Sequence, residues 1–263
     1  MIILKIGGGK DININGIADD LARIKKQFII VHGAHFLRKS FADKLQIPLK
    51  EINSISGYSS ILSNKAIIDL QMMVYAGLQN KRIVEVMHQK GINALGVCGI
   101  DGSLIRGKRN KGIRVKNGNK LKLLKDLSGK PHDINKKLFN IFLQNQITPV
   151  LTIPILDENN TAINSENDDC VQIIQEKLHA EKVIYLIEAP GLLKDPSDSS
   201  SSITHISWLE LEKWEAKAQG RIKRKLHAIN KLLKSGTKEV IISDGRSEHP
   251  LSDSLKGKGT LIK

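Results

Sequence analysis

Three consecutive glycines directly follow a short apolar run near the start of the chain and could bind a phosphate group. The run covers residues 2–6 and contains Lys5, and it is followed by Gly7, Gly8 and Gly9. Glycine has no Cβ, so the backbone N–H groups after such a strand stay open to a ligand. Backbone amides and a helix N-terminus form an anion site, to which Lys5 would add positive charge. The segment therefore favours phosphate binding over an ordinary turn.

Other groups of small, polar or basic residues follow later apolar runs. They are His32-Gly33-Ala34-His35, 164–169, 190–196 and 220–225. Two of these segments have a plainer interpretation: the Asn and Asp residues of 164–169 could cap a helix, and the basic run of 220–225 could be a solvated helix face. Segment 102–109 has the spacing of a P-loop but ends in Arg109, where a P-loop needs Ser or Thr for magnesium. The chain has neither G-x-G-x-x-G nor G-x-S-x-G.

The elements that must position these residues are alternating strands and helices. Compact aliphatic runs predict strands at 2–6, 28–31, 94–97, 148–153, 182–187 and 239–242. Apolar residues at helical spacing lie between them, and the longest such stretch runs from near Ser63 past Val86. This alternation predicts an α/β fold with a mainly parallel sheet, whose ligand site forms at the carboxyl ends of the strands.

Composition narrows the class of protein. The 263 residues are 40% hydrophobic and 26% charged, as in ordinary globular proteins. No apolar run approaches the ~20 residues of a membrane helix, and the N-terminus does not resemble a secretory signal. Cys98 and Cys170 are too isolated for a disulfide framework or a zinc site. We therefore expect a cytoplasmic protein with no membrane association and no metal site of its own.

The net charge of +14 favours an acidic partner. An aromatic content of 4% argues against base-stacking platforms, and no nucleic-acid-binding motif is present, so nucleic acid is not expected. Segment 106–125 has nine basic residues and no acidic one, with Asn117-Gly118 in its middle. Asn-Gly predicts a hairpin turn. Segment 196–202 is polar and is expected to be a mobile loop.

The order and spacing of these pieces resemble the amino acid kinase family over essentially the whole chain. Within it, the sequence resembles the acetylglutamate kinases, and above all the kinases that act on 2-aminoadipate or glutamate held on a small acidic carrier protein of the LysW type. The motifs that suggest this branch are Ser56-Gly57-Tyr58, Met72-Met73-Val74, Gly99-Ile100-Asp101-Gly102 and Leu127-Ser128-Gly129-Lys130. The resemblance implies one αβα domain over 1–263, with an acceptor lobe at about 1–165 and a nucleotide lobe at about 166–263. We also expect a homodimer through the long helix near Met72.

The resemblance assigns roles to individual residues. Lys5 and Lys225 would stabilise the transferring phosphoryl group, and Asp168 would hold both lysines. The residues expected on the nucleotide side are Gly7, Gly8, Gly9, Glu188, Gly191 and Lys194. Those expected on the acceptor side are Gly33, Ala34, His35, Ile61 and Asn164, with the whole 32–35 loop facing the acceptor. The cofactors would be ATP and the Mg²⁺ that binds with it.

The chain departs from the family pattern mainly on the acceptor side. Ala34-His35 replaces part of a glycine run, and Glu188 replaces an aspartate near the nucleotide. The family's substrate arginine falls on Ile61, and the following aspartate falls on Asn64. An isoleucine cannot form a bidentate pair with a carboxylate, so either the acceptor differs or catalysis is lost. His35 or Lys65 could supply another cation.

The expected activity is phosphorylation of the side-chain carboxylate of an amino-protected acidic amino acid, in lysine or arginine-type biosynthesis. A carboxylate acceptor is already ionised at neutral pH and needs no general base. The carrier would dock on the basic segment through Arg106, Lys108, Arg109, Lys111 and Arg114. Two alternatives remain: an acetylglutamate kinase acting on a free small molecule, and a nucleotide-binding regulatory protein with little catalysis.

Overall fold

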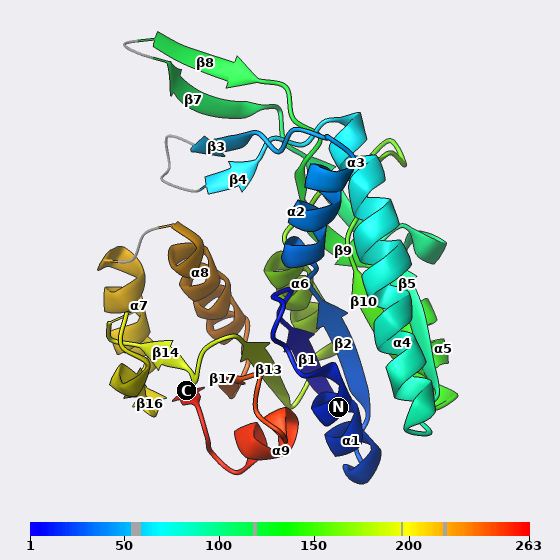
Figure 1. Ribbon diagram of the computed structural model, residues 1–263, viewed down its shortest axis with the longest axis vertical. Coiled ribbons are helices and arrows are strands. Elements are labelled where there is room, and N and C mark those ends of the chain that lie inside the picture. Colours follow the sequence, from blue (N-terminus) through cyan, green and yellow to red (C-terminus); the bar gives the residue numbers. More distant parts are fainter. Residues whose placement is uncertain (54–58, 118–119, 196, 218–219) are drawn as a thin grey trace.

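The computed structural model describes residues 1–53, 59–117, 120–195, 197–217 and 220–263, and its centre is an eight-stranded sheet (Figure 1). Its strands, in spatial order, are β16 (His205–Ile206), β18 (Thr260–Ile262), β17 (Val240–Asp244), β13 (Lys182–Ile187), β1 (Ile2–Ile6), β2 (Phe28–His32), β10 (Thr148–Thr152) and β5 (Ala94–Cys98). All neighbours are parallel except β17 and β18. The predicted α/β fold with a mainly parallel sheet is therefore confirmed.

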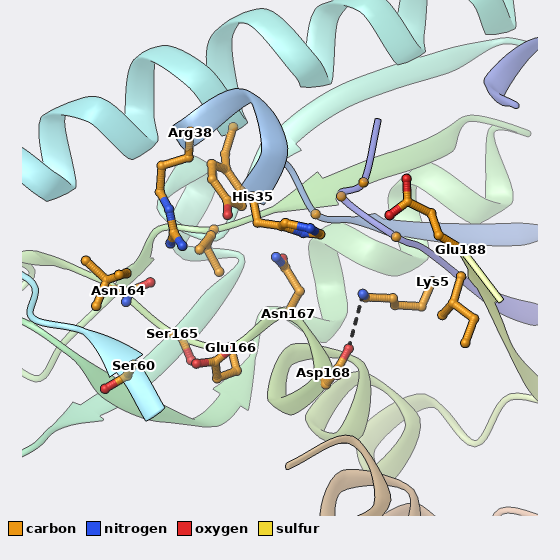
Figure 2. Close-up of a pocket in the computed structure, with 18 of the residues that line it drawn as sticks. Lys5, His35, Arg38, Ser60, Asn164, Ser165, Glu166, Asn167, Asp168 and Glu188 are labelled. Atoms are coloured by element: carbon orange, nitrogen blue, oxygen red, sulfur yellow. Dashed lines mark ion pairs between the residues drawn. The ribbon is translucent and has the colours of Figure 1, made fainter. Parts of the chain in front are cut away.

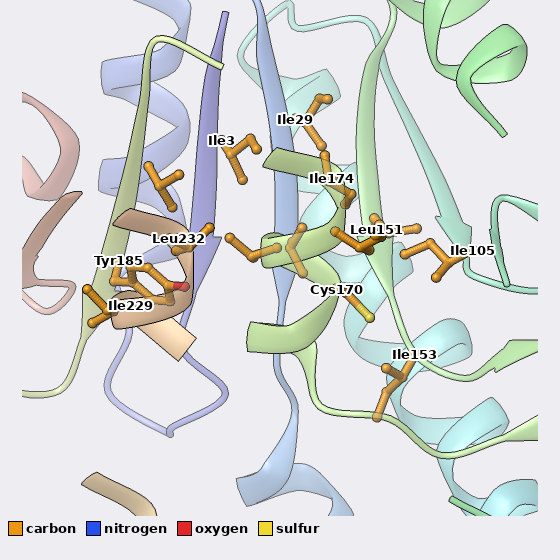
Figure 3. Packing of buried hydrophobic residues seen from close by; sticks show 14 of the residues in the cluster. Ile3, Ile29, Ile105, Leu151, Ile153, Cys170, Ile174, Tyr185, Ile229 and Leu232 are labelled. Atoms are coloured by element: carbon orange, nitrogen blue, oxygen red, sulfur yellow. The ribbon is translucent and has the colours of Figure 1, made fainter. Parts of the chain in front are cut away.

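Alternating residues of the strands build two separate cores. Ile2 and Leu4 pack on one face with α1 (Ile14–Arg23), α4 (Asn80–Gln89) and α9 (Pro250–Leu255). Ile3 packs on the other face with residues of α5 (Lys136–Gln144), α6 (Asn167–Leu178) and α8 (Gly220–Lys234). Figure 3 shows part of the second core, in which Ile3, Ile29 and Tyr185 of the strands face Ile174 of α6 and Leu232 of α8. Because side chains alternate along a strand, Lys5 shares the face of Ile3 and lies on the α6 side.

Smaller sheets lie around the carboxyl ends of the central strands. A four-stranded sheet contains β12 (Ala162–Ile163), β11 (Ile155–Leu156), β6 (Ile105–Arg109) and β9 (Gly129–Ile134). Three strand pairs complete the set: β3 (Glu51–Asn53) with β4 (Ser59–Ile61), β7 (Ile113–Asn117) with β8 (Lys120–Leu124), and β14 (Leu192–Leu193) with β15 (Ser202–Ile203). Figure 1 shows β7 and β8 extending beyond β3 and β4 at one end of the molecule.

The remaining helices connect these strands. They are α2 (His35–Lys44), α3 (Lys65–Gln71), the π-helical η1 (Met72–Gln79), α7 (Trp208–Lys217) and the short 3₁₀ turns η2 (Asp101–Ser103) and η3 (Ser199–Ser201). The elements α3, η1 and α4 follow one another without a break and form the predicted long helix. In the described part of the chain, no helix is long and apolar enough to cross a membrane.

All six predicted strands occur, with ends that shift by at most two residues. The single basic hairpin expected over 106–125 was wrong, because β6 pairs with β9 and β11 while only β7 and β8 form the hairpin. Within the segment expected to be mobile, Asp198 accepts hydrogen bonds from the N–H and hydroxyl of Ser200 and so caps η3. Gly118, Pro196 and the Ser56-Gly57-Tyr58 motif lie outside the described residues.

His32 at the end of β2 is fully buried and belongs to the core. Its Nε2 lies 3.1 Å from Asn80 Nδ2, and its Nδ1 lies 3.2 Å from the carbonyl oxygen of Gly33. Asn80 is a donor here, so Nε2 accepts and Nδ1 carries the proton, as in a neutral imidazole. Burial, together with the nearby charge of Lys5, lowers the pKa of His32 to about 4. The expectation that His32 faces an acceptor was therefore wrong.

The protein is expected to lose stability as the pH falls from about 6.5 to about 4, in part through His32. The unfolded chain takes up a proton on this imidazole near its ordinary pKa, whereas the folded protein does so only near pH 4, so acid favours unfolding in this window. The contribution lost between pH 7 and pH 5 is about 2 kcal/mol. Urea unfolding of the wild type and His32→Gln at both pH values measures it. The variant should lose about 2 kcal/mol less than the wild type, and equal losses would contradict a buried neutral imidazole.

Candidate active site

A cavity of about 320 Å³ opens at the carboxyl ends of the central strands. Its walls come from the loops after β1, β2 and β13, from the start of α6, and from α2 and β4 (Figure 2). Because neighbouring parallel strands end at the same edge of the sheet, segments far apart in the sequence converge here. The cavity therefore lies where the alternation of strands and helices predicted a ligand site.

One end of the cavity is formed by the glycines after β1, which pack backbone against backbone on the loop after β2. The amide of Phe36 donates to the carbonyl oxygen of Gly8 at 3.0 Å. A Cβ on Gly8 would overlap the backbone of Gly33 and the amide nitrogen of Ala34. These atoms belong to main chain and cannot rotate away, so only glycine fits at position 8. The two loops thus form a backbone-lined cradle of the kind that takes phosphate groups.

Lys5 and Asp168 meet beside this cradle. The Nζ atom of Lys5 lies 3.4 Å from Oδ1 of Asp168, and their side chains are only 11% and 17% exposed (Figure 2). Asp168 stands in the first turn of α6, where the positive end of the helix dipole stabilises a carboxylate. The ion pair with Asp168 therefore holds the ammonium group of Lys5 near the glycines.

Tyr185 lies close to the same carboxylates. Its burial, together with the nearby Asp168 and Asp169, raises the pKa of Tyr185 well above its usual value, so the phenol stays neutral.

The predicted nucleotide-side residues do not all reach this cavity. Glu188 lines it and accepts a hydrogen bond from the amide of Asp11 at 2.7 Å. Gly191 and Lys194 are not among the described residues that line it. Gly191 packs against Thr260 of β18, and Lys194 is exposed. Lys225 belongs to α8, but its side chain lies outside the description.

Of the predicted acceptor-side residues, Gly33 and Ala34 pack on Gly8 at the glycine end, whereas Asn164 and Ile61 lie at the opposite end. Asn164 is held firmly, because Gln71 donates to its Oδ1 at 2.7 Å and its Nδ2 donates to Ser63 at 2.9 Å. Ile61, at the end of β4, lines the wall nearby. Asn64, which stands where the family has aspartate, caps α3 by accepting from the amide of Ile67 at 3.0 Å.

Sequence reasoning missed Arg38. Its side chain points from α2 toward Asn164 and Ser60, and it lines the same cavity as His35 (Figure 2). Lys65, considered above as a substitute cation, is exposed and is not among the described residues that line the cavity. The signal was present in the chain: if a helix begins at His35, residue 38 lies one turn later on the same face.

The predicted docking residues divide into two groups. Arg106 and Arg109 are half-buried and pair with the β11–β12 turn: Arg106 donates to Asn160 at 2.7 Å, and Arg109 Nε lies 3.4 Å from the fully buried carboxylate of Asp157. The other predicted docking residues, Lys108, Lys111 and Arg114, are exposed. The segment therefore has fewer available charges than its sequence suggests.

A second cavity of about 200 Å³ adjoins the first. The two share the lining residues Ser60, Ile61, Asn164, Ser165 and Glu166. The second extends to Asn110 and Ile113 at the start of the basic strands, and to Lys130 of β9. The two cavities thus meet at these shared residues, between the glycine cradle and the base of β7.

Comparisons with known proteins show which family the chain resembles. The amino acid kinase family matches residues 1–244. The LysW-aminoadipate kinase of Thermus thermophilus is 34% identical over the whole of both chains, and that of Deinococcus radiodurans is 32% identical over 100% of this chain and 91% of its own. The acetylglutamate kinase of Caldicellulosiruptor saccharolyticus is 29% identical over 99% of this chain and 89% of its own.

Solved structures of low sequence identity show the same fold. A protein of Streptococcus mutans superposes with a TM-score of 0.74 at 20% identity, over 100% of this chain and 98% of its own. The carbamate kinase of Giardia gives a TM-score of 0.69 at 13% identity, over 99% and 97% of the two chains.

Gly8→Ala is expected to destabilise the fold, because the added methyl group meets main-chain atoms of the neighbouring loop. Overpacking of this kind costs about 1–3 kcal/mol, which urea unfolding measures. Gly77→Ala is the matched control, since Gly77 lies in η1 and an added Cβ would meet only the carbonyl oxygen of Met72, at 3.3 Å. The control should change stability much less than Gly8→Ala does, because its one close contact is longer than those at Gly8. A Gly8→Ala variant as stable as the control would contradict the close packing of the two loops.

Proposed function

This chain belongs to the amino acid kinase family and is a phosphotransferase with a carboxyl group as acceptor; from that premise we propose its acceptor and its partner. The acceptor is the side-chain carboxylate of 2-aminoadipate or glutamate, whose amino group is held by a small acidic carrier protein. The phosphoryl donor is ATP, bound with Mg²⁺, and the product is an acyl phosphate. The named relatives support a place in amino-acid biosynthesis.

The observation that carries this proposal is the arrangement of the two adjoining cavities. One end has the glycine cradle with Lys5, and the other passes Asn164 and Ile61 toward the base of the basic strands. An acceptor that enters from β7 would present its carboxylate to a phosphoryl group in the cradle. A free small molecule would need no such path.

The chemistry needs positioning and charge neutralisation more than covalent work by the protein. In our proposal the amides of the glycine loop and the Lys5 ammonium neutralise the transferring phosphoryl group. Asp168 holds Lys5 in place, and Lys225 contributes from α8. Gly8 has no Cβ, so the loop after β1 packs directly on the loop after β2 and the two keep the shape of the cradle.

Mg²⁺ would enter with the nucleotide and help neutralise the charge that develops on the phosphate groups. The carboxylates of Glu188 and Asp168 line the cavity. Within the described residues, no group of three or more His, Cys, Asp and Glu side chains could hold a metal ion. This arrangement suits Mg²⁺, which keeps several waters and is usually bound by phosphates with one or two carboxylates.

The acidic carrier would dock on the outer strands. Arg114 and Lys122 are exposed on β7 and β8, and the same pair of strands carries Leu121 and Leu123, which are 66% and 59% exposed. Cationic and apolar side chains thus lie together next to the second cavity. Positive charges of this kind steer and orient an acidic protein, and the apolar side chains supply buried contact.

The homodimer predicted through the long helix stays a prediction. Met73 on η1 is 51% exposed, and Leu95 on the edge strand β5 is 40% exposed. These side chains are the apolar contacts that a partner subunit would cover.

Two rival functions are separated from ours by a single assay. Turnover is measured with ATP and three acceptors: free acetylglutamate, free 2-aminoadipate, and 2-aminoadipate or glutamate linked to a LysW-type carrier. We expect efficient turnover only of the carrier-linked acceptors. Efficient turnover of free acetylglutamate would favour the small-molecule kinase. No turnover of any acceptor, in a protein that binds ATP tightly, would favour the regulatory protein.

Lys5→Met should lower turnover while leaving the fold intact. Methionine keeps the aliphatic packing of a side chain that is only 11% exposed but removes its charge. Loss of one charge-stabilising contact in the transition state typically costs roughly 10²–10³ in turnover. Steady-state assays at saturating ATP test this, and the same loss is expected for Lys225→Ala. Wild-type turnover in Lys5→Met would show that the lysine has another role.

Charge reversal on the exposed basic residues should abolish carrier binding. The variant is Lys108→Glu, Lys111→Glu and Arg114→Glu, and it omits Arg109 because Asp157 would then lose its buried partner. Carrier affinity is expected to fall at least about tenfold and to weaken steeply with salt in the wild type.

The matched control for this prediction changes the same net charge elsewhere. Arg23, Lys25 and Lys256 are exposed on the side of α1 and α9, remote from β7 and β8 in Figure 1. Their reversal to Glu should leave carrier affinity unchanged, and both variants should bind ATP normally. Equal carrier affinity in the two triple variants would mean that β7 and its flanks are only a solvated surface.

A further inference from the structure

We propose that Arg38 binds a second carboxylate of the acceptor, the one that does not react, and so takes the place left empty by Ile61. This inference rests on the proposed function for the identity of the acceptor. It assigns this binding role to a residue of α2 that neither the composition nor the motif spacing indicated as part of the site.

The placement of Arg38 follows from the first turn of α2. His35 begins the helix, and Arg38 lies three residues later on the same face, so both side chains reach the cavity. The amide of Phe36 binds the carbonyl oxygen of Gly8, and the amide of Arg38 binds that of Ala34 at 2.9 Å. The helix that carries Arg38 is therefore anchored to the glycine cradle itself.

Arg38 has unused hydrogen-bonding capacity inside the cavity. Its Nε atom is buried and, among the described residues, has no hydrogen-bond partner. The described ion pairs do not include Arg38, although the carboxylate of Glu51 lines the same cavity. A buried donor without a partner is costly, and a ligand carboxylate would satisfy it. The planar guanidinium can bind both oxygens of that carboxylate at once.

The other cations of the cavity are less suited to this role. Three of the described lining residues have basic side chains, namely Lys5, His35 and Arg38. Lys5 is already paired with Asp168 at the glycine end. His35 offers no fork that matches a carboxylate. Figure 2 shows Arg38 on the far side of His35 from Lys5, pointing toward Asn164.

The geometry thus separates two anionic sites by function. A carboxylate near Lys5 and the glycines would receive the phosphoryl group, and a carboxylate at Arg38 would hold the acceptor in register. The ligand class that fits is a dicarboxylic amino acid whose amino group is acylated and whose α-carboxylate is free. Ile61 leaves this end of the cavity without a second guanidinium, so recognition depends on Arg38.

Binding is measured by calorimetry with two probes, N-acetyl-2-aminoadipate and its α-carboxamide, in the presence of a non-hydrolysable ATP analogue. The wild type should bind the diacid about 10- to 100-fold tighter than the amide, the difference expected for a charge-assisted pair. Arg38→Gln should bind both probes equally and weakly. Lys39→Gln, on the neighbouring exposed residue of α2, should keep the wild-type preference.

Arg38→Lys is a second variant that retains the charge, and it is expected to recover only part of the preference because it lacks the fork. It also serves if Arg38→Gln does not fold. A wild type that binds diacid and amide equally, or an Arg38→Gln variant that keeps the full preference, would overturn the proposal. An intact preference in a protein that phosphorylates no acceptor would count against the proposed function and not against the role of Arg38.

Discussion

The site depends on one backbone contact, the packing of the loop after β1 on the loop after β2. Gly8 lies so close to Gly33 and Ala34 that no side chain fits between them. The same contact lets Phe36 donate to Gly8, which fixes the start of α2. Because β1 carries Lys5 and α2 carries Arg38, the same pair of loops determines where these two cavity-lining side chains lie. Main-chain atoms make this contact, so it leaves no room for a side chain at Gly8.

Charge pairing decides which basic residues of this chain are available. A net charge of +14 suggests an excess of unpaired cations everywhere. Yet Lys5 forms an ion pair with Asp168, and Arg109 forms one with the buried Asp157, which is distant in sequence. Arg38 differs from both, since a buried atom of its guanidinium lacks a hydrogen-bond partner among the described residues. Whether a basic side chain can bind a ligand therefore depends on the partners that the fold gives it, and not on the net charge of the chain.

Sequence reasoning succeeded where the signal was local. Each buried parallel strand is a continuous aliphatic run, so β1 and β13 could be predicted to the residue, and the glycines and Lys5 stand directly at the end of β1. The position of Asp168 beside Lys5 came from the family resemblance, because nothing in the local pattern joins residues 5 and 168.

Long-range pairing was beyond sequence reasoning. The strand β6 looked like one arm of a hairpin because the charges of 106–125 are continuous, but its partners β9 and β11 are set by the tertiary fold. The two-residue strands β11 and β12 are too short to give a periodic signal. Arg38 was missed because one arginine on a helix is usually a surface residue; its position one turn after His35 was the available signal, and the structure shows that it lines the cavity.

The spatial order of the strands also determines when the site can form. Lys5 in β1 is flanked by Val31 of β2 on one side and by Tyr185 of β13 on the other. During synthesis, the β2 side can assemble once the first few dozen residues have emerged, but the wall that contains Glu188 is made much later. Contacts of such high sequence separation are slow to form because a long loop must close first. The contact between the two glycine-containing loops is therefore one of the earliest available to the chain, and the wall that contains Glu188 is one of the last.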